Sequence, residues 1–112
     1  LFALGLANLG IDIQKYKQCS FERIAGRFFN SAEYEYLKRS SFKDFFDVWT
    51  AKESYVKYTG QGINNDYGKF SVINDRGEIG MDGLYLTRIP FVDGYSVCLC
   101  ADRKISVRIF CA

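Results

Sequence analysis

Histidine is absent from this sequence of 112 residues, and its four cysteines form no CxxC pair. Without histidine, the chain has no Ser-His-Asp triad and no Cys-His pair of its own for nucleophilic catalysis. The spacing of a zinc site is also missing among the cysteines, which are Cys19, Cys98, Cys100 and Cys111. We therefore interpret them as buried thiols of a cytoplasmic protein.

Long apolar runs and a strong charge of one sign are also missing. No stretch approaches the roughly 20 apolar residues that cross a membrane. Residues 1–9 are apolar but lack the basic segment and cleavage site of a signal peptide, and we interpret them as a buried strand. The net charge of +2 is too small to indicate nucleic-acid binding by itself. We expect neither a membrane nor a nucleic acid as a partner.

The composition is that of a packed domain. Hydrophobic residues make up 48% and aromatic residues 17% of the chain, which argues against disorder, and the length fits one domain over residues 1–112. Charge is uneven, because residues 15–43 hold seven Lys or Arg but only three Glu. This stretch, the basic segment, is compatible with a solvated helical face or with a surface for an acidic partner or phosphates.

The most informative stretch is residues 41–62, which has the pattern of one amphipathic helix ended by glycine. On a helical wheel, one apolar stripe contains Phe42, Phe45, Phe46, Trp49 and Val56. Glu53 lies in the middle of that stripe, and Lys57 follows one turn later. The residues expected on the opposite side include Thr50, Ala51 and Ser54.

Glu53 is the exception in this pattern. A carboxylate in an apolar stripe costs free energy unless something pairs with it. One interpretation is an ordinary i,i+4 ion pair with Lys57, which stabilises a helix by about a few tenths of a kcal/mol. The other is that Glu53 faces a cation at a functional site. The helix alone leaves both interpretations open.

The remaining elements predict the fold class. Residues 10–14 alternate, which predicts a strand with Asp12 and Gln14 on one side and Ile11 and Ile13 on the other. Ser20 predicts the start of a helix over 21–29, and the pattern from residue 31 predicts a second helix to about residue 38. Strands are expected over 69–74, 83–89, 95–101 and 105–110. The order predicts an α+β fold with helices packed on one face of a mainly antiparallel sheet.

Four segments, in this order, resemble the Sfp-type phosphopantetheinyl transferases of the holo-acyl-carrier-protein synthase superfamily. They are GIDIQ at 10–14, RFFNSAEYEYL at 27–37, FFDVWTAKESYVKYTGQGI at 45–63 and GYSVCLCA at 94–101. The block WTAKESYVKYTGQG is specific, whereas GIDIQ alone would be weak, and the match covers nearly the whole chain. Trp49 favours the Sfp type over the small trimeric carrier-protein synthases.

The resemblance implies transfer of the 4′-phosphopantetheine arm of coenzyme A to a serine of an acyl or peptidyl carrier protein, leaving 3′,5′-adenosine bisphosphate. It implies Mg²⁺ bound by Asp12 and Glu53, with Lys57 at the phosphates. Glu53 is the expected acceptor of the serine proton, and Lys52 is a further expected phosphate contact. Gln14 stands where the family usually has a third acidic residue. Its amide oxygen or a water would take that place, so metal affinity should fall.

The resemblance also implies a preceding half of similar fold that completes the coenzyme pocket, with this chain as the C-terminal half. A homo-oligomer would be another way to complete it. Three functions stay open at this point. The chain is part of an Sfp-type transferase, or a non-catalytic module that docks acidic carrier proteins through the basic segment. The third is a structural domain in which Glu53 pairs only with Lys57.

Overall fold

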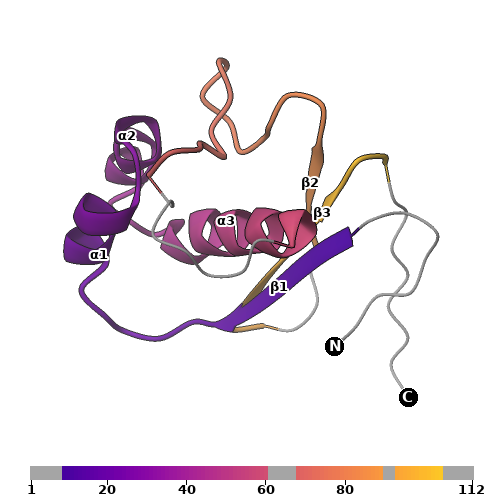
Figure 1. Ribbon diagram of the computed structural model, residues 1–112. Coiled ribbons are helices and arrows are strands. Elements are labelled where there is room, and N and C mark those ends of the chain that lie inside the picture. The colour runs from indigo at the N-terminus through magenta and orange to yellow at the C-terminus, as the bar shows by residue number, and fades with distance from the viewer. Residues whose placement is uncertain (1–8, 61–67, 90–92, 105–112) are drawn as a thin grey trace.

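The computed structural model describes residues 9–60, 68–89 and 93–104, in which helices pack against one face of an antiparallel sheet (Figure 1). The elements are β1 (Leu9–Lys15), α1 (Phe21–Phe28), α2 (Ser31–Arg39), α3 (Phe45–Thr59), β2 (Tyr85–Arg88) and β3 (Tyr95–Ala101). This confirms the predicted α+β class. The first eight residues and the strand expected over 105–110 lie outside the described residues. Within the described part, no helix has the length and apolarity of a membrane span.

The sheet is built around β3. Both β1 and β2 pair with it in antiparallel fashion, giving the order β1-β3-β2. Its central position explains why β3 is buried from Ser96 to Ala101. Burial raises the pKa of the Cys98 thiol to about 11 and that of Cys100 to about 12, so both thiols are protonated at neutral pH. For these two cysteines the prediction of buried thiols is confirmed.

Helix α3 packs closely on β1 and β3, and Gly10 sets how closely. A Cβ added to Gly10 would lie 2.0 Å from the carbonyl oxygen of Ser54 and 2.4 Å from the backbone nitrogen of Tyr58. Only glycine allows a helix backbone to approach a strand to this distance. The turn of α3 that contains residues 54–58 therefore lies directly over β1.

The predicted orientation of α3 is wrong in one respect. The helix meets the sheet through small side chains, because Thr50, Ala51 and Ser54 are fully buried on that side. Its aromatic residues pack elsewhere, as shown by Phe45, whose ring centroid is 4.9 Å from that of Phe21 of α1. A helix enclosed on two sides has no single apolar stripe, so a wheel that ranks hydrophobicity finds only its most aromatic side.

Helices α1 and α2 lie where they were predicted, whereas α3 begins later than expected. Helix α2 is capped by Asn30, with a capping box in which Asn30 and Glu33 bind each other's backbone N–H groups. Helix α3 begins at Phe45 rather than near residue 41, because Ser41 and Phe42 have left-handed backbones with φ of 55° and 64°. Its end at Gly60, which is also left-handed, is confirmed.

Between α3 and β2 the described backbone is irregular. The strand predicted over 69–74 is not formed, and a single isolated bridge joins Ile73 to Ile79. This bridge flanks the predicted turn, in which the N–H of Gly77 donates to the carbonyl of Asn74 at 2.9 Å. Residues 70–72 instead satisfy backbone groups with side chains from α2 and α3, as described below.

Candidate functional site

Asp12 of β1 is the centre of the first polar site. Its side chain is only 4% exposed. The ammonium group of Lys57 donates to its Oδ1 at 2.8 Å, and the amide Nε2 of Gln14 donates to its Oδ2 at 3.2 Å. The predicted alternation of β1, with Asp12 and Gln14 on one side, is therefore confirmed. Lys57 itself is 52% exposed, so this ion pair lies at the edge of the β1–α3 interface.

The packing of α3 on β1 places Glu53 in the stretch of helix that passes Asp12. Gly10 touches α3 at residues 54–58, and Asp12, two residues along the strand, is reached by Lys57. Glu53 is one turn before Lys57 and shares its side of the helix. It is partly exposed. Gln14 and Lys57 thus both contact Asp12, and Glu53 lies on the adjacent turn of α3.

The donor atoms at this place fit a hard cation. Carboxylate and amide oxygens, here from Asp12, Glu53 and Gln14, are the ligands that Mg²⁺ prefers, and Mg²⁺ usually takes one or two protein carboxylates. Among the described residues there is no group of three or more His, Cys, Asp or Glu that could hold a metal. Water and substrate oxygens would therefore have to complete the shell, as is usual for Mg²⁺.

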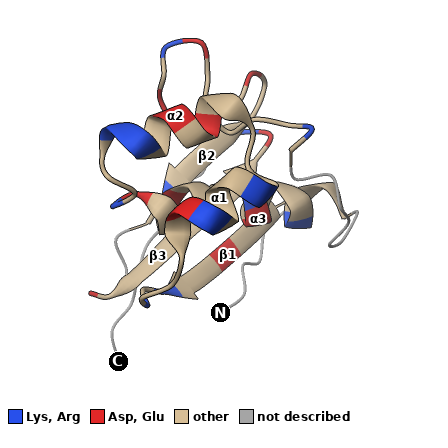
Figure 2. Cartoon of the chain, turned by 90° about the vertical axis from the view of Figure 1, so that its left-hand side faces the viewer, with Lys and Arg blue, Asp and Glu red and all other residues tan. Residues whose placement is uncertain are grey.

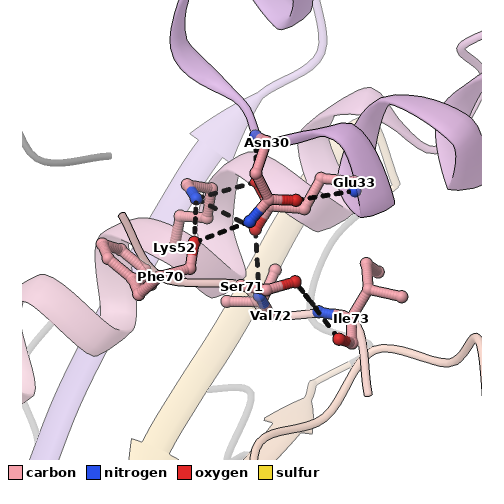
Figure 3. A network of polar contacts seen from close by, with 7 residues as sticks. All are labelled: Asn30, Glu33, Lys52, Phe70, Ser71, Val72 and Ile73. Carbon is pink, nitrogen blue, oxygen red and sulfur yellow. Dashed lines mark hydrogen bonds and ion pairs between the residues drawn. The ribbon is translucent and has the colours of Figure 1, made fainter. Parts of the chain in front are cut away.

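Lys52 lies in a different environment, shown in Figure 3. Its ammonium group donates to both carboxylate oxygens of Glu33, at 2.8 and 2.9 Å, and to the carbonyl of Phe70 at 3.0 Å. These three acceptors match the three N–H donors of a lysine. Burial lowers the pKa of Lys52, and the charge of Glu33 partly offsets this. The structure does not bring Lys52 together with Asp12 and Lys57.

Glu33 extends this pair into a network that joins α2, α3 and residues 70–72. Its carboxylate also accepts the backbone N–H groups of Asn30 at 3.1 Å and Val72 at 2.9 Å. The side chain of Asn30 donates in turn to the carbonyl of Phe70 at 2.9 Å (Figure 3). The sequence patterns did not predict this network. A glutamate at the third position of α2, after a capping asparagine, was the only local signal for it.

Asp47, near the start of α3, forms a third polar cluster. Its Oδ2 accepts from the Arg88 guanidinium at 2.6 Å, and its Oδ1 accepts from the hydroxyl of Ser96 at 2.9 Å. The hydroxyls of Ser96 and Thr50 are 3.0 Å apart. These contacts tie the first turns of α3 to β2 and β3, and both carboxylate oxygens are used. We interpret the cluster as structural.

The basic segment lies beside this cluster. An open hollow of about 470 Å³ is lined by four aromatic and five polar residues, namely Tyr16, Lys17, Gln18, Phe21, Phe42, Lys43, Asp44, Phe46 and Asp47. Figure 2 shows basic and acidic residues interspersed on α1 and α2, so the positive charge is not gathered into one block. The hollow therefore offers apolar contact together with two lysines and two aspartates.

A comparison with protein families shows which family the chain belongs to. The model of the 4′-phosphopantetheinyl transferase superfamily matches residues 8–107, which include all six helices and strands described. The chain belongs to the 4′-phosphopantetheinyl transferase superfamily. The resemblance that the sequence motifs indicated is therefore confirmed.

Individual members of the transferase superfamily agree with this. The 4′-phosphopantetheinyl transferase Sfp of Bacillus subtilis is 33% identical over 104 residues, covering 83% of this chain and 46% of that protein. A second transferase from Bacillus subtilis, ffp, is 32% identical over 107 residues, covering 85% and 47%. HetI of Nostoc sp. is 43% identical over 61 residues, covering 50% and 26%. The chain spans about half the length of the first two relatives.

Proposed function

We propose that this chain carries the metal and phosphate site of an enzyme that transfers the 4′-phosphopantetheine arm of coenzyme A to a serine of an acyl or peptidyl carrier protein. The observation that supports it best is the contact between Asp12 and Lys57. These residues lie in the two motifs GIDIQ and WTAKESYVKYTGQG, which are 45 residues apart at this pair and meet at 2.8 Å in the fold.

Three side chains have distinct proposed roles. Asp12 and Glu53 would hold Mg²⁺, with Gln14 contributing its amide oxygen or orienting a water. When bound, the ion would neutralise the pyrophosphate of coenzyme A. Lys57 would donate to phosphate oxygens, which its exposure allows. Lys52 is left out of this group, because its donors are engaged inside the protein.

The reaction itself is a phosphoryl transfer, in which positioning and charge neutralisation supply most of the rate. The serine oxygen forms a bond to the phosphorus that carries the pantetheine arm. The bond from that phosphorus to the oxygen of 3′,5′-adenosine bisphosphate breaks. Glu53, partly exposed beside the site, is the proposed base that accepts the serine proton.

The test uses the full natural polypeptide that carries this sequence. It is mixed with coenzyme A, Mg²⁺ and an apo carrier protein, and the intact mass of the carrier is followed. The carrier should gain one phosphopantetheine arm, and the gain should be lost with EDTA and in Glu53→Gln. Glu78→Gln, which neutralises an exposed carboxylate far along the chain, is the matched control and should keep the activity. No mass gain with any apo carrier tried would reject the proposal.

A second candidate is a module that binds carrier proteins without catalysis. The observation in its favour is the hollow, whose four aromatic residues suit apolar side chains of a partner. Lys17 and Lys43 could bind acidic groups of that partner, and Asp44 and Asp47 could bind basic ones. This candidate predicts carrier binding that weakens with salt and persists in Glu53→Gln, with no mass gain under any condition.

A further inference from the structure

Lys57 binds a carboxylate oxygen of Asp12 that the proposed metal would also need as a ligand. The ammonium group lies 2.8 Å from Oδ1 of Asp12, and the carboxylate is otherwise enclosed by the protein. Gln14 holds the other oxygen at 3.2 Å. Each oxygen of this buried carboxylate therefore already has a hydrogen-bond donor.

The net charge of the side chains around Asp12 is small. Because Gln14 is neutral, Asp12 and Gln14 together carry one negative charge, Glu53 on the adjacent turn adds a second, and the positive charge of Lys57 offsets one of the two. A divalent ion on Asp12 would stand beside that ammonium group, and two cations that share one carboxylate repel each other. Lys57 can leave, because its side chain is 52% exposed and its flexible stem can turn the ammonium group toward water.

We propose that Lys57 and the metal compete for Asp12, and that metal binding releases Lys57 toward the phosphates of the coenzyme. This inference rests on the proposed function, because it takes Asp12 as a metal ligand. Lys57 is then a built-in cation that fills the site until metal and phosphates arrive together. The two ligands favour each other's binding, since the phosphates offer Lys57 a new partner.

The competition is tested with Mn²⁺ alone as the probe, by measuring free Mn²⁺ with electron paramagnetic resonance. Lys57→Met should bind Mn²⁺ at least about tenfold more tightly than the wild type, within the usual range of coupling between sites. Lys57→Arg, which keeps the charge, should stay within about threefold of the wild type. Lys15→Met removes the same charge from the exposed end of β1 and controls for long-range electrostatics.

Two more variants keep the test decisive. Lys57→Gln can still donate to Asp12 but carries no charge, so it should also bind Mn²⁺ more tightly, and it replaces Lys57→Met if that protein does not fold. Adding Asp12→Asn should abolish the tighter Mn²⁺ binding of both Lys57→Met and Lys57→Gln. Equal or weaker Mn²⁺ binding in folded Lys57→Gln would overturn the proposal, and so would a gain that survives Asp12→Asn.

The release step has its own readout. Coenzyme A should tighten Mn²⁺ binding more in the wild type than in Lys57→Gln, because only the wild type has a displaced lysine to engage the phosphates. An equal effect in both proteins would overturn this step. The two proposals fail differently. If the carrier gains the phosphopantetheine arm but Lys57 and Mn²⁺ do not compete for Asp12, only the inference about Lys57 is rejected. If they compete but no carrier gains the arm, only the proposed function is rejected.

Discussion

Two lysines of α3, five residues apart, make ion pairs of the same length in opposite surroundings. Lys52 is 1% exposed and donates to Glu33 at 2.8 Å, whereas Lys57 is 52% exposed and donates to Asp12 at 2.8 Å. The first has all its donors bound within the protein, and the second can turn to a ligand. Enclosure, rather than distance, separates a lysine that holds the fold together from one that is available for chemistry.

The largest effect on stability is expected at the enclosed pair. Lys52→Met leaves the Glu33 carboxylate buried without its cation and should lower the free energy of unfolding by about 3–5 kcal/mol. Urea unfolding of the variant and the wild type measures this directly. A loss below about 1 kcal/mol, the value typical of surface pairs, would show that the pair does not hold α2 and α3 together.

A double variant checks the reason for that loss. Glu33→Gln combined with Lys52→Met removes both charges, while the glutamine oxygen still accepts a hydrogen bond from Asn30 or Val72. It should recover a large part of the stability that Lys52→Met loses, because no unpaired charge stays buried. If the double variant is no more stable than Lys52→Met, lost packing rather than unpaired charge explains the effect.

The next effect comes from separating α3 from β1 without changing any charge. Gly10→Ala would force the helix backbone away from the strand, and overpacking of this kind costs about 1–3 kcal/mol or more. Because the contact between Lys57 and Asp12 spans the same interface, Mn²⁺ binding at Asp12 should change as well, whereas the Glu33 network should not.

Gly26 of α1 provides the matched control for this substitution. A Cβ there would meet only the ring of Tyr34 at 3.8 Å, which is ordinary contact. Gly26→Ala should therefore be neutral or stabilise the helix by up to about 1 kcal/mol. Equal stability of the Gly10→Ala and Gly26→Ala variants in thermal unfolding would contradict the close approach of α3 to β1.

A smaller effect is expected at the exposed pair. Lys57→Met should lower the free energy of unfolding by less than Lys52→Met, by about 1–3 kcal/mol, because the enclosed Asp12 carboxylate keeps the Gln14 amide and water can reach the place that Lys57 leaves. Chemical unfolding beside Lys52→Met gives the comparison under one set of conditions. A loss as large as that of Lys52→Met would mean that Lys57 is a structural residue.

The smallest expected effect is the different response of the two ion pairs, Asp12–Lys57 and Glu33–Lys52, to salt. Raising the ionic strength from about 0.1 M to 1 M shortens the Debye length from about 10 Å to 3 Å. The coupling between Asp12 and Lys57 in a double-mutant cycle should fall by about a few tenths of a kcal/mol, because one partner faces water. The coupling between Glu33 and Lys52 should not change, and a decrease there would show that water reaches this pair.

The sequence could predict the features that depend on local pattern, but not the ion-pair partners of Lys52 and Lys57. The alternation around Asp12, the strand over 95–101 and the end of α3 at Gly60 follow from local pattern, and each is confirmed. The partner of Lys57 is 45 residues away along the chain, and that of Lys52 is 19 residues away. Such pairs depend on how elements pack, and no local period contains that information. The motif resemblance, rather than periodicity, is what predicts that Asp12 and Glu53 share one site.

The burial of Lys52 shows the limit most clearly. The family resemblance implied that this residue contacts phosphates. Its environment is instead made by Glu33 of α2 and by Phe70, from a segment that was expected to be a strand. The small sheet-facing side of α3, with Thr50, Ala51 and Ser54, has no hydrophobic signal that would reveal a second buried face.

The most direct measurement is the rate of phosphopantetheine transfer per folded molecule in two variants of the full natural polypeptide. Lys57→Met should lower the rate by at least about a hundredfold, because it removes the proposed donor to the reacting phosphates. The double variant Glu33→Gln/Lys52→Met, once folded, should stay within about tenfold of the wild type, because its residues are placed away from the reaction. A wild-type rate in Lys57→Met, or a loss confined to the double variant, would contradict the account.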